Sequence, residues 1–133
     1  MKRLQLDDDG HCFACGKRNP RGLQLDFRNE NGRTAADFLP HKEHQGFKDI
    51  VHGGIIATVL DEAMVKAALS TGIQAVTAEL TVRFKSPLLT WEYATVMAEL
   101  SRPEGRVVET SARMLKRDGT LVAEARAKLL RNE

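Results

Sequence analysis

The sequence lacks several features that would identify the class of protein directly. Among its 133 residues, Lys and Arg number 20 and Asp and Glu number 18, and the net charge of +2 forms no block of one sign. This balance argues against a partner such as nucleic acid or a membrane surface. No apolar run approaches the roughly 18 residues that span a bilayer, and the opening MKRLQLDDDG lacks the apolar core of a signal peptide. We therefore expect a cytoplasmic protein.

Cysteine is also scarce. The two cysteines, Cys12 and Cys15, form a single C-x-x-C in the segment HCFACGKRNPRGL. A structural zinc site normally takes four ligands, and a disulfide is not expected in a reducing compartment. His41 and His44 could complete a set of two cysteines and two histidines, although their spacing is loose for such a site. We therefore expect no metal, and we interpret residues 1–21 as an N-terminal loop.

Alternation of apolar and polar residues predicts that much of the chain is extended. It predicts a half-buried strand over 23–29, and the Asn-Gly turn in ENGR would return the chain antiparallel through 34–39. Further strands are predicted over 76–85, 93–100, 106–115 and 121–129, the last two joined by an Asp-Gly turn. The dry face of the strand over 76–85 would carry Val76, Ala78, Leu80, Val82 and Phe84.

One stretch, from Ile55 to Leu69, is too apolar for a surface helix. Eleven of its fifteen residues are apolar, so the predicted helix must be covered on most sides. Its polar exceptions share one narrow stripe; they are Thr58, Asp61, Glu62 and Lys66. The inward faces of the later strands are rich in alanine, which allows a helix to approach closely. We predict a single α+β domain over 1–133, in which a long central helix is wrapped by a curved, mostly antiparallel sheet of five to six strands.

Two motifs bring this pattern close to a known family. HGGIIATVLDE, followed by TAELTVRFKSPL, resembles the hotdog-fold thioesterases, specifically the PaaI-like acyl-CoA thioesterase branch. CFACGKRNPRGL is similar to the N-terminal loop of some members of that branch. The resemblance implies a hotdog fold and a homodimer or dimer of dimers. It also implies hydrolysis of an acyl-CoA thioester with no metal or organic cofactor.

The resemblance also assigns roles by position. The aspartate nine residues after the motif histidine would be the catalytic carboxylate, here Asp61, and the first glycine, Gly53, would offer its N–H to the thioester carbonyl. Thr77 would help to place water or substrate. Some relatives carry an Asn six residues before the histidine, where this chain has Gly46. The expected substrate-binding residues are Gln45, His52, Gly54, Thr58 and Arg83.

Several of these residues also have a structural interpretation that does not involve the substrate. His52 could shape the turn by hydrogen bonding, and Thr58 could bond its own helix backbone. Thr77 shares a strand face with polar residues that patterning alone would place in solvent. Glu62 is expected to be structural, paired with Lys66 at i+4.

The chemistry of the residues fits thioester hydrolysis. A helix N-terminus with glycines presents free N–H groups to a developing oxyanion, and Asp61 could act as general base on water or as a nucleophile that forms an anhydride. Eight helical residues separate Gly53 from Asp61, roughly 12 Å, so the two cannot touch one carbonyl carbon. We therefore expect antiparallel helices of two copies to form two composite sites.

Three other functions remain open. The same fold could be a non-catalytic module that binds or senses acyl-CoA. The cysteines could organise an interaction module around a metal. A hotdog dehydratase would pair a histidine with an acidic residue in a different loop setting, which this sequence does not display.

Overall fold

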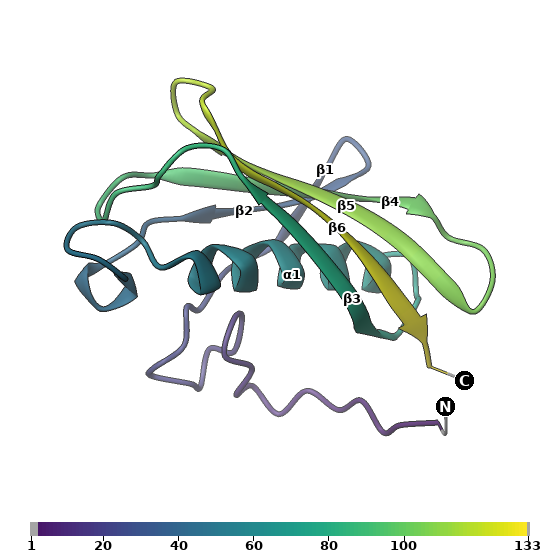
Figure 1. Ribbon diagram of the computed structural model, residues 1–133. Coiled ribbons are helices and arrows are strands. Elements are labelled where there is room, and N and C mark those ends of the chain that lie inside the picture. Colours follow the sequence, from purple (N-terminus) through teal and green to yellow (C-terminus); the bar gives the residue numbers. More distant parts are fainter. Residues whose placement is uncertain (1–2, 133) are drawn as a thin grey trace.

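The computed structural model describes residues 3–132 and places one long helix against a curved sheet (Figure 1). The helix α1 spans Gly53–Leu69 and follows a short 3-10 helix, η1 (Lys42–His44). The strands are β1 (Arg28–Glu30), β2 (Arg33–Phe38), β3 (Ala75–Phe84), β4 (Ala94–Arg102), β5 (Val107–Lys116) and β6 (Leu121–Arg131). They form one sheet in the order β1-β2-β4-β5-β6-β3, and every neighbouring pair is antiparallel. This arrangement confirms the predicted fold class.

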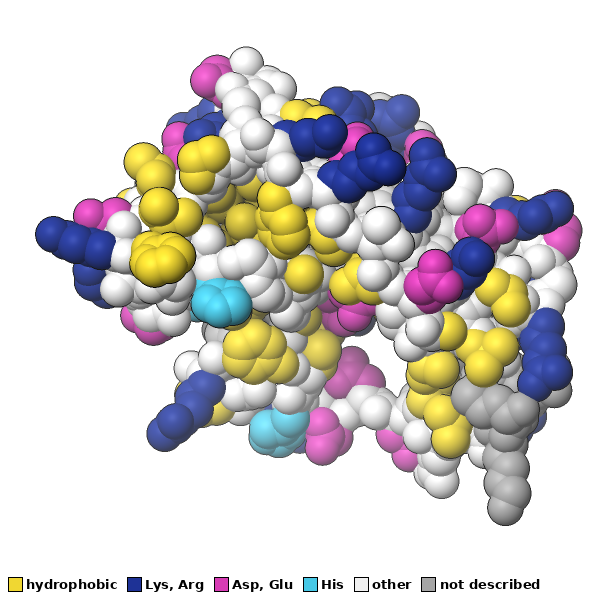
Figure 2. All heavy atoms as spheres, in the orientation of Figure 1, with side chains coloured by type: hydrophobic (Ala, Val, Ile, Leu, Met, Phe, Trp, Pro, Cys, Tyr) yellow, Lys and Arg dark blue, Asp and Glu magenta, His cyan; other side chains and the backbone are white. Residues whose placement is uncertain are grey.

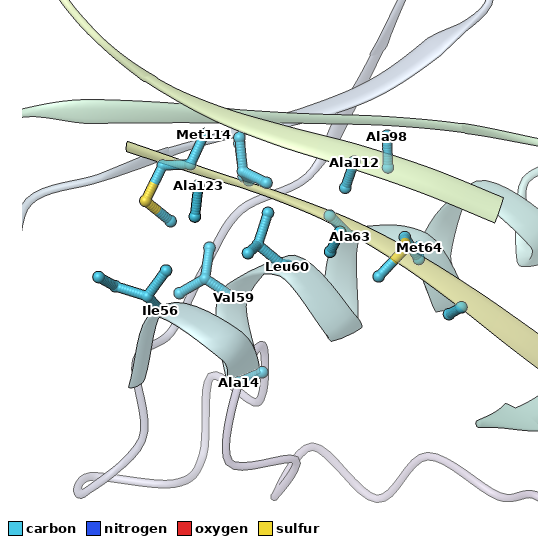
Figure 3. Packing of buried hydrophobic residues seen from close by; sticks show 14 of the residues in the cluster. Ala14, Ile56, Val59, Leu60, Ala63, Met64, Ala98, Ala112, Met114 and Ala123 are labelled. Carbon is cyan, nitrogen blue, oxygen red and sulfur yellow. The ribbon is translucent and has the colours of Figure 1, made fainter. Parts of the chain in front are cut away.

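The core lies between α1 and the concave face of the sheet (Figure 3). Leu60 and Met64 of α1 are fully buried and point toward the sheet. The sheet residues that meet the helix include Ala98, Ala112 and Ala123, each at most 2% exposed. These small side chains let the helix backbone approach the strands closely, as the sequence predicts.

The N-terminal segment covers the opposite side of α1. In Figure 1 it runs beneath the helix, and in Figure 3 Ala14 lies across the helix from the sheet. Ala14 and Leu25 are each only 4% exposed and belong to the same core. The helix is therefore apolar nearly all round because two different parts of the chain cover it.

The strand predicted over 23–29 is wrong, because the backbone before Arg28 does not pair with the sheet. Its apolar residues do pack against the core, but Leu23 and Leu25 donate backbone hydrogen bonds to Phe13 and Ala14 rather than to a strand of the sheet. Gln24 has a φ of 52°, which interrupts an extended conformation. The alternation therefore records burial against α1, and only the end of the segment, from Arg28, joins the sheet as β1.

The other predicted elements are confirmed to within about two residues. The Asn-Gly turn joins β1 to β2, with positive φ at both Asn31 and Gly32, as a tight hairpin requires. The Asp-Gly turn joins β5 to β6, and the helix begins at Gly53, two residues before the predicted start. No helix in the part of the chain that the structure describes is long and apolar enough to cross a membrane.

A β-bulge in β3 changes which side chains face the helix. Thr77 pairs with Leu129 of β6 and Glu79 pairs with Lys128, which leaves Ala78 as an extra residue. Leu129 is fully buried, so its partner Thr77 shares the helix-facing side. The predicted dry face is therefore wrong for its first two members, because Val76 and Ala78 precede the shift in alternation. Leu80, Val82 and Phe84 follow it and do face the helix side, opposite buried alanines of β6.

Candidate active site

A hydrogen-bonded pair joins the middle of α1 to β3. The Thr77 hydroxyl donates to Oδ1 of Asp61 at 2.7 Å. The bulge at Ala78 makes this contact possible, because uninterrupted alternation would turn Thr77 away from the helix side together with Thr81 and Arg83. Two of the three residues to which the family resemblance assigns catalytic roles, Asp61 and Thr77, are thus brought together.

The surroundings of Asp61 make its carboxylate a stronger base than an exposed one. Burial raises its pKa above the ordinary value of 3.8, the Thr77 hydrogen bond opposes that rise, and the nearby charge of Glu62 adds to it. A raised pKa moves a carboxylate toward the range in which proton transfer at neutral pH is efficient. The Thr77 hydroxyl occupies one oxygen and holds the carboxylate in place.

The start of α1 leaves one backbone donor free. His52 caps the helix, and its Nδ1 accepts a hydrogen bond from the Gly54 N–H at 2.8 Å. Among residues 3–132, no group accepts a hydrogen bond from the Gly53 N–H, and Gly53 is exposed. His52 therefore shapes the turn by hydrogen bonding, which is the structural role considered from the sequence. The donor of Gly54 is already used, whereas that of Gly53 is available to a ligand.

This free donor and the Asp61 carboxylate cannot meet within one chain. Both residues belong to α1, and eight residues of helix separate them by roughly 12 Å along the axis. An acyl carbonyl held at Gly53 would therefore lie too far from Asp61 of the same chain for direct attack.

The edge of the sheet nearest these groups carries exposed apolar side chains, and no further strand pairs with it among residues 3–132. β3 is the last strand in the sheet order, and on its helix-facing side Leu80 and Phe84 are 37% and 55% exposed. In the same orientation as Figure 1, Figure 2 shows hydrophobic side chains exposed at the left, in the middle and at the lower right of the molecule. Exposed apolar surface on an edge strand is typical of a protein interface.

The remaining predicted site residues have other contacts. Thr58 donates its hydroxyl to the Gly54 carbonyl at 2.9 Å, so it bonds its own helix. The Gln45 side chain accepts from the Asp49 N–H at 2.9 Å and closes the loop before α1. Arg83 is exposed and lies on the outer face of β3 opposite Glu124. Within one chain, these residues are not gathered around Asp61.

Sequence reasoning missed a second cluster beside Asp61. Cys12 donates its thiol hydrogen to Oε2 of Glu62 at 3.5 Å, so Glu62 contacts the N-terminal segment. Burial lowers the pKa of Lys66, but its interactions with Cys15 and Glu62 outweigh this effect and raise the pKa above the ordinary value. The C-x-x-C motif was the only signal of this cluster, because its carboxylate lies fifty residues further along the chain.

The histidines that could complete a zinc site, His41 and His44, have other contacts. The His41 ring stacks on Trp91 with 4.7 Å between ring centroids, and His44 accepts a hydrogen bond from the His41 N–H. In the described range 3–132, the two cysteines group with Glu62 and with no histidine. A site made of two cysteines and two histidines therefore does not fit this structure.

Fold and site together define a class of protein. A long helix wrapped by a curved antiparallel sheet, with glycines at its start and a carboxylate at its middle, is the hotdog arrangement. Residues 48–123, more than half of the chain, match the family model described as the thioesterase superfamily. The chain belongs to the thioesterase superfamily.

Individual relatives agree with this assignment. Mouse acyl-coenzyme A thioesterase THEM4 is 35% identical over 96 residues, which are 71% of this chain and 41% of that protein. The chain spans less than half the length of the curated relatives it matches.

Solved structures share the fold. The Escherichia coli PaaI protein from the phenylacetic acid degradation operon superposes with a TM-score of 0.76 at 21% identity, over 82% of this chain and 80% of that one. A Streptococcus mutans protein bound to acetyl CoA also gives a TM-score of 0.76, at 17% identity, over 80% of this chain and 87% of that one.

Proposed function

We propose that this chain is an acyl-CoA thioesterase, which hydrolyses an acyl-CoA to the free acid and coenzyme A. The hydrogen bond between Thr77 and the half-buried Asp61 carries this proposal, because it orients a carboxylate of raised pKa. The name of mouse THEM4 and the acetyl CoA bound to the Streptococcus mutans structure support the substrate class.

The reaction needs a base or nucleophile and a donor for the oxyanion. In one route, Asp61 takes a proton from water while the resulting hydroxide adds to the thioester carbonyl carbon. In the other route, Asp61 itself adds to that carbon and forms an anhydride, which water then opens. In both, the carbonyl oxygen becomes negative beside the Gly53 N–H and the positive end of α1. In both routes, this negatively charged intermediate collapses as the C–S bond breaks, and coenzyme A leaves as its thiolate, which takes up a proton. In the second route this is the step that forms the anhydride.

The site is composite in this proposal. Gly53 of one protomer faces Asp61 of its partner across antiparallel copies of α1, so a twofold dimer holds two equal sites. The separation of the two residues within one helix supports such an arrangement. The exposed apolar side chains at the β3 edge, Leu80 and Phe84, are suited to the subunit interface.

Activity is tested on short-chain, long-chain and aromatic acyl-CoAs. The wild type should hydrolyse at least one class, and Asp61→Asn should lower kcat by roughly 10²- to 10⁴-fold, the usual contribution of a general acid or base. Release of the free thiol is followed with a thiol reagent. A wild type that binds these compounds without turnover would replace this proposal with the binding or sensing module.

The composite site is tested by mixing two inactive chains. Asp61→Ala retains the glycine turn, and Gly53→Pro retains the carboxylate but lacks the N–H. A mixed dimer has one intact site only if the two groups come from different protomers. Random exchange of equal amounts should restore about a quarter of the wild-type sites, since about half of the dimers are mixed. Sites formed within single chains would give no recovery.

A further inference from the structure

The N-terminal segment is folded into a tight turn that holds both cysteines. Gly16 donates its N–H to the Cys12 carbonyl at 2.8 Å, and Arg18 donates to the Gly10 carbonyl at 2.9 Å. A Cβ on Gly16 would lie 2.5 Å from the Cys12 nitrogen and the Gly10 oxygen, so only glycine fits there. Because buried Ala14 anchors this turn against α1, the positions of both thiols are set by backbone structure. The segment lies outside the matched family region, 48–123.

The turn directs both thiols at one carboxylate. The ligand atoms of Cys12, Cys15 and Glu62 all lie within 4.8 Å of one another. Around a tetrahedral zinc ion, bond lengths of about 2.3 Å to sulfur and 2.0–2.2 Å to oxygen place neighbouring sulfur and oxygen ligands about 3.6 Å apart. The observed distance from the Cys12 Sγ to the Glu62 Oε2 is 3.5 Å. The Cys12–Glu62 spacing therefore already matches that around a zinc ion, and Cys15 lies within 4.8 Å of both groups.

Charge favours a cation at this position. The Glu62 carboxylate places a negative charge within 4.8 Å of both thiols. A bound dication would be attracted by this charge and would stabilise the thiolates directly. Two thiolates, one carboxylate and a zinc ion sum to one negative charge, which the ammonium group of Lys66 beside Cys15 offsets.

The cluster is also open to solvent. A cavity of about 340 Å³ is lined by Cys15 and Lys66, and Asp8 lies on its wall. Cys12 and Glu62 are half-buried and do not line this cavity, so an ion would enter past Cys15, with room for water as a fourth ligand. In Figure 1 the N-terminal segment passes beneath α1, so an ion in this cluster would join that segment to the helix.

We propose that Cys12, Cys15 and Glu62 bind a thiophilic divalent cation, with zinc as the best fit, and that this ion clamps the N-terminal segment to α1 next to Asp61. Two thiolates and one carboxylate select zinc over magnesium or calcium, which prefer oxygen ligands alone. The site is separate from the thioesterase chemistry, and its test does not depend on activity.

The test uses the full chain, reduced and loaded with Zn²⁺ or Co²⁺. After dialysis, elemental analysis should find about one zinc per chain, and Co²⁺ should produce the intense thiolate-to-metal absorption of a tetrahedral site. The paired substitution Cys12→Ser and Cys15→Ser should abolish both signals, and Glu62→Gln should weaken binding at least tenfold. Lys66→Gln, which removes only the supporting charge, should weaken it by roughly 10- to 100-fold.

His41→Ala with His44→Ala is the matched control and should bind the metal as the wild type does. Loss of metal in this control would overturn the ligand set. Wild-type protein that retains no zinc and shows no thiolate band with Co²⁺ would overturn the site itself, whatever the variants do. So would a Cys12–Cys15 disulfide that forms in the presence of zinc and excludes it.

Discussion

The sharpest test of the proposed oxyanion donor is a single substitution that removes the Gly53 N–H and little else. Gly53 is the first residue of α1, the position where proline is favoured because its missing N–H has no helical partner. The preceding residue, His52, has φ −60° and ψ 132°, an extended conformation that proline accepts in its predecessor. A Cβ at Gly53 would lie 3.5 Å from the Phe84 ring, an ordinary contact. Gly53→Pro should therefore fold as the wild type does.

The expected effect is on catalysis alone. Loss of one oxyanion donor costs about 2.7–4 kcal/mol of transition-state stabilisation, so kcat should fall by roughly 10²- to 10³-fold. The Tm should remain equal or rise slightly, because proline restricts the unfolded chain. Steady-state hydrolysis of the preferred acyl-CoA gives kcat and KM, and a calorimetric scan gives the Tm.

Gly53→Ala is the matched control, since it introduces the same Cβ contact but keeps the N–H. It should retain kcat to within a few-fold. The reasoning is refuted if Gly53→Pro folds normally and keeps comparable activity. It is equally refuted if Gly53→Ala loses as much activity as Gly53→Pro, because sterics would then explain both.

Three further predictions follow from named contacts. Thr77→Val removes a hydrogen bond to a charged group, worth about 1.5–3 kcal/mol, so kcat/KM should fall by roughly 10- to 150-fold. The pKa of Asp61 should also rise, which moves the acid limb of the pH–rate profile to higher pH. Thr81→Val on the outer face is the control and should change neither kcat/KM nor the pH profile. The pKa of Asp61 is raised in the folded state, so ionisation of this carboxylate lowers the free energy of unfolding. The loss is complete above the folded-state pKa and absent well below the ordinary value of 3.8. Asp61→Asn should therefore have a higher Tm than the wild type at neutral pH, with the gap closing as pH falls below about 4; equal Tm values at pH 7 would contradict this. Leu60→Ala empties a fully buried position and should cost about 3 kcal/mol, or roughly 10 °C in Tm; a loss under about 1 kcal/mol would show that the core is less tightly packed than the structure indicates.

Local pattern predicted most elements because each carries its own periodicity. The helix shows eleven apolar residues in fifteen, and four strands show long period-two alternation, so their types follow from burial on one or on nearly all sides. The same alternation predicts a strand over 23–29, where the structure differs. Alternation reports which side chains are buried but not which backbone they pair with, and here the partner is the turn at residues 13–14.

The candidate site, too, can be predicted from the sequence only in part. The position of Asp61 on a polar stripe of the helix was readable from spacing, and so was its separation from Gly53. The inward orientation of Thr77 was not readable, since it depends on one extra residue, Ala78, in the pairing of β3 with β6. Without that bulge, Thr77 would share the outer face with Thr81.

Local composition and periodicity are enough to predict a helix that must be covered on almost every side, the alanine-lined strands that wrap it, and a carboxylate within its polar stripe. These features depend on a few neighbouring residues. Three contacts arise only in the tertiary structure: Thr77 reaches Asp61, His52 occupies the Gly54 donor but leaves that of Gly53 free, and Cys12 and Cys15 meet Glu62. Each of these contacts depends on strand register, cap geometry or the docking of a distant segment, which are settled when the whole chain packs around α1.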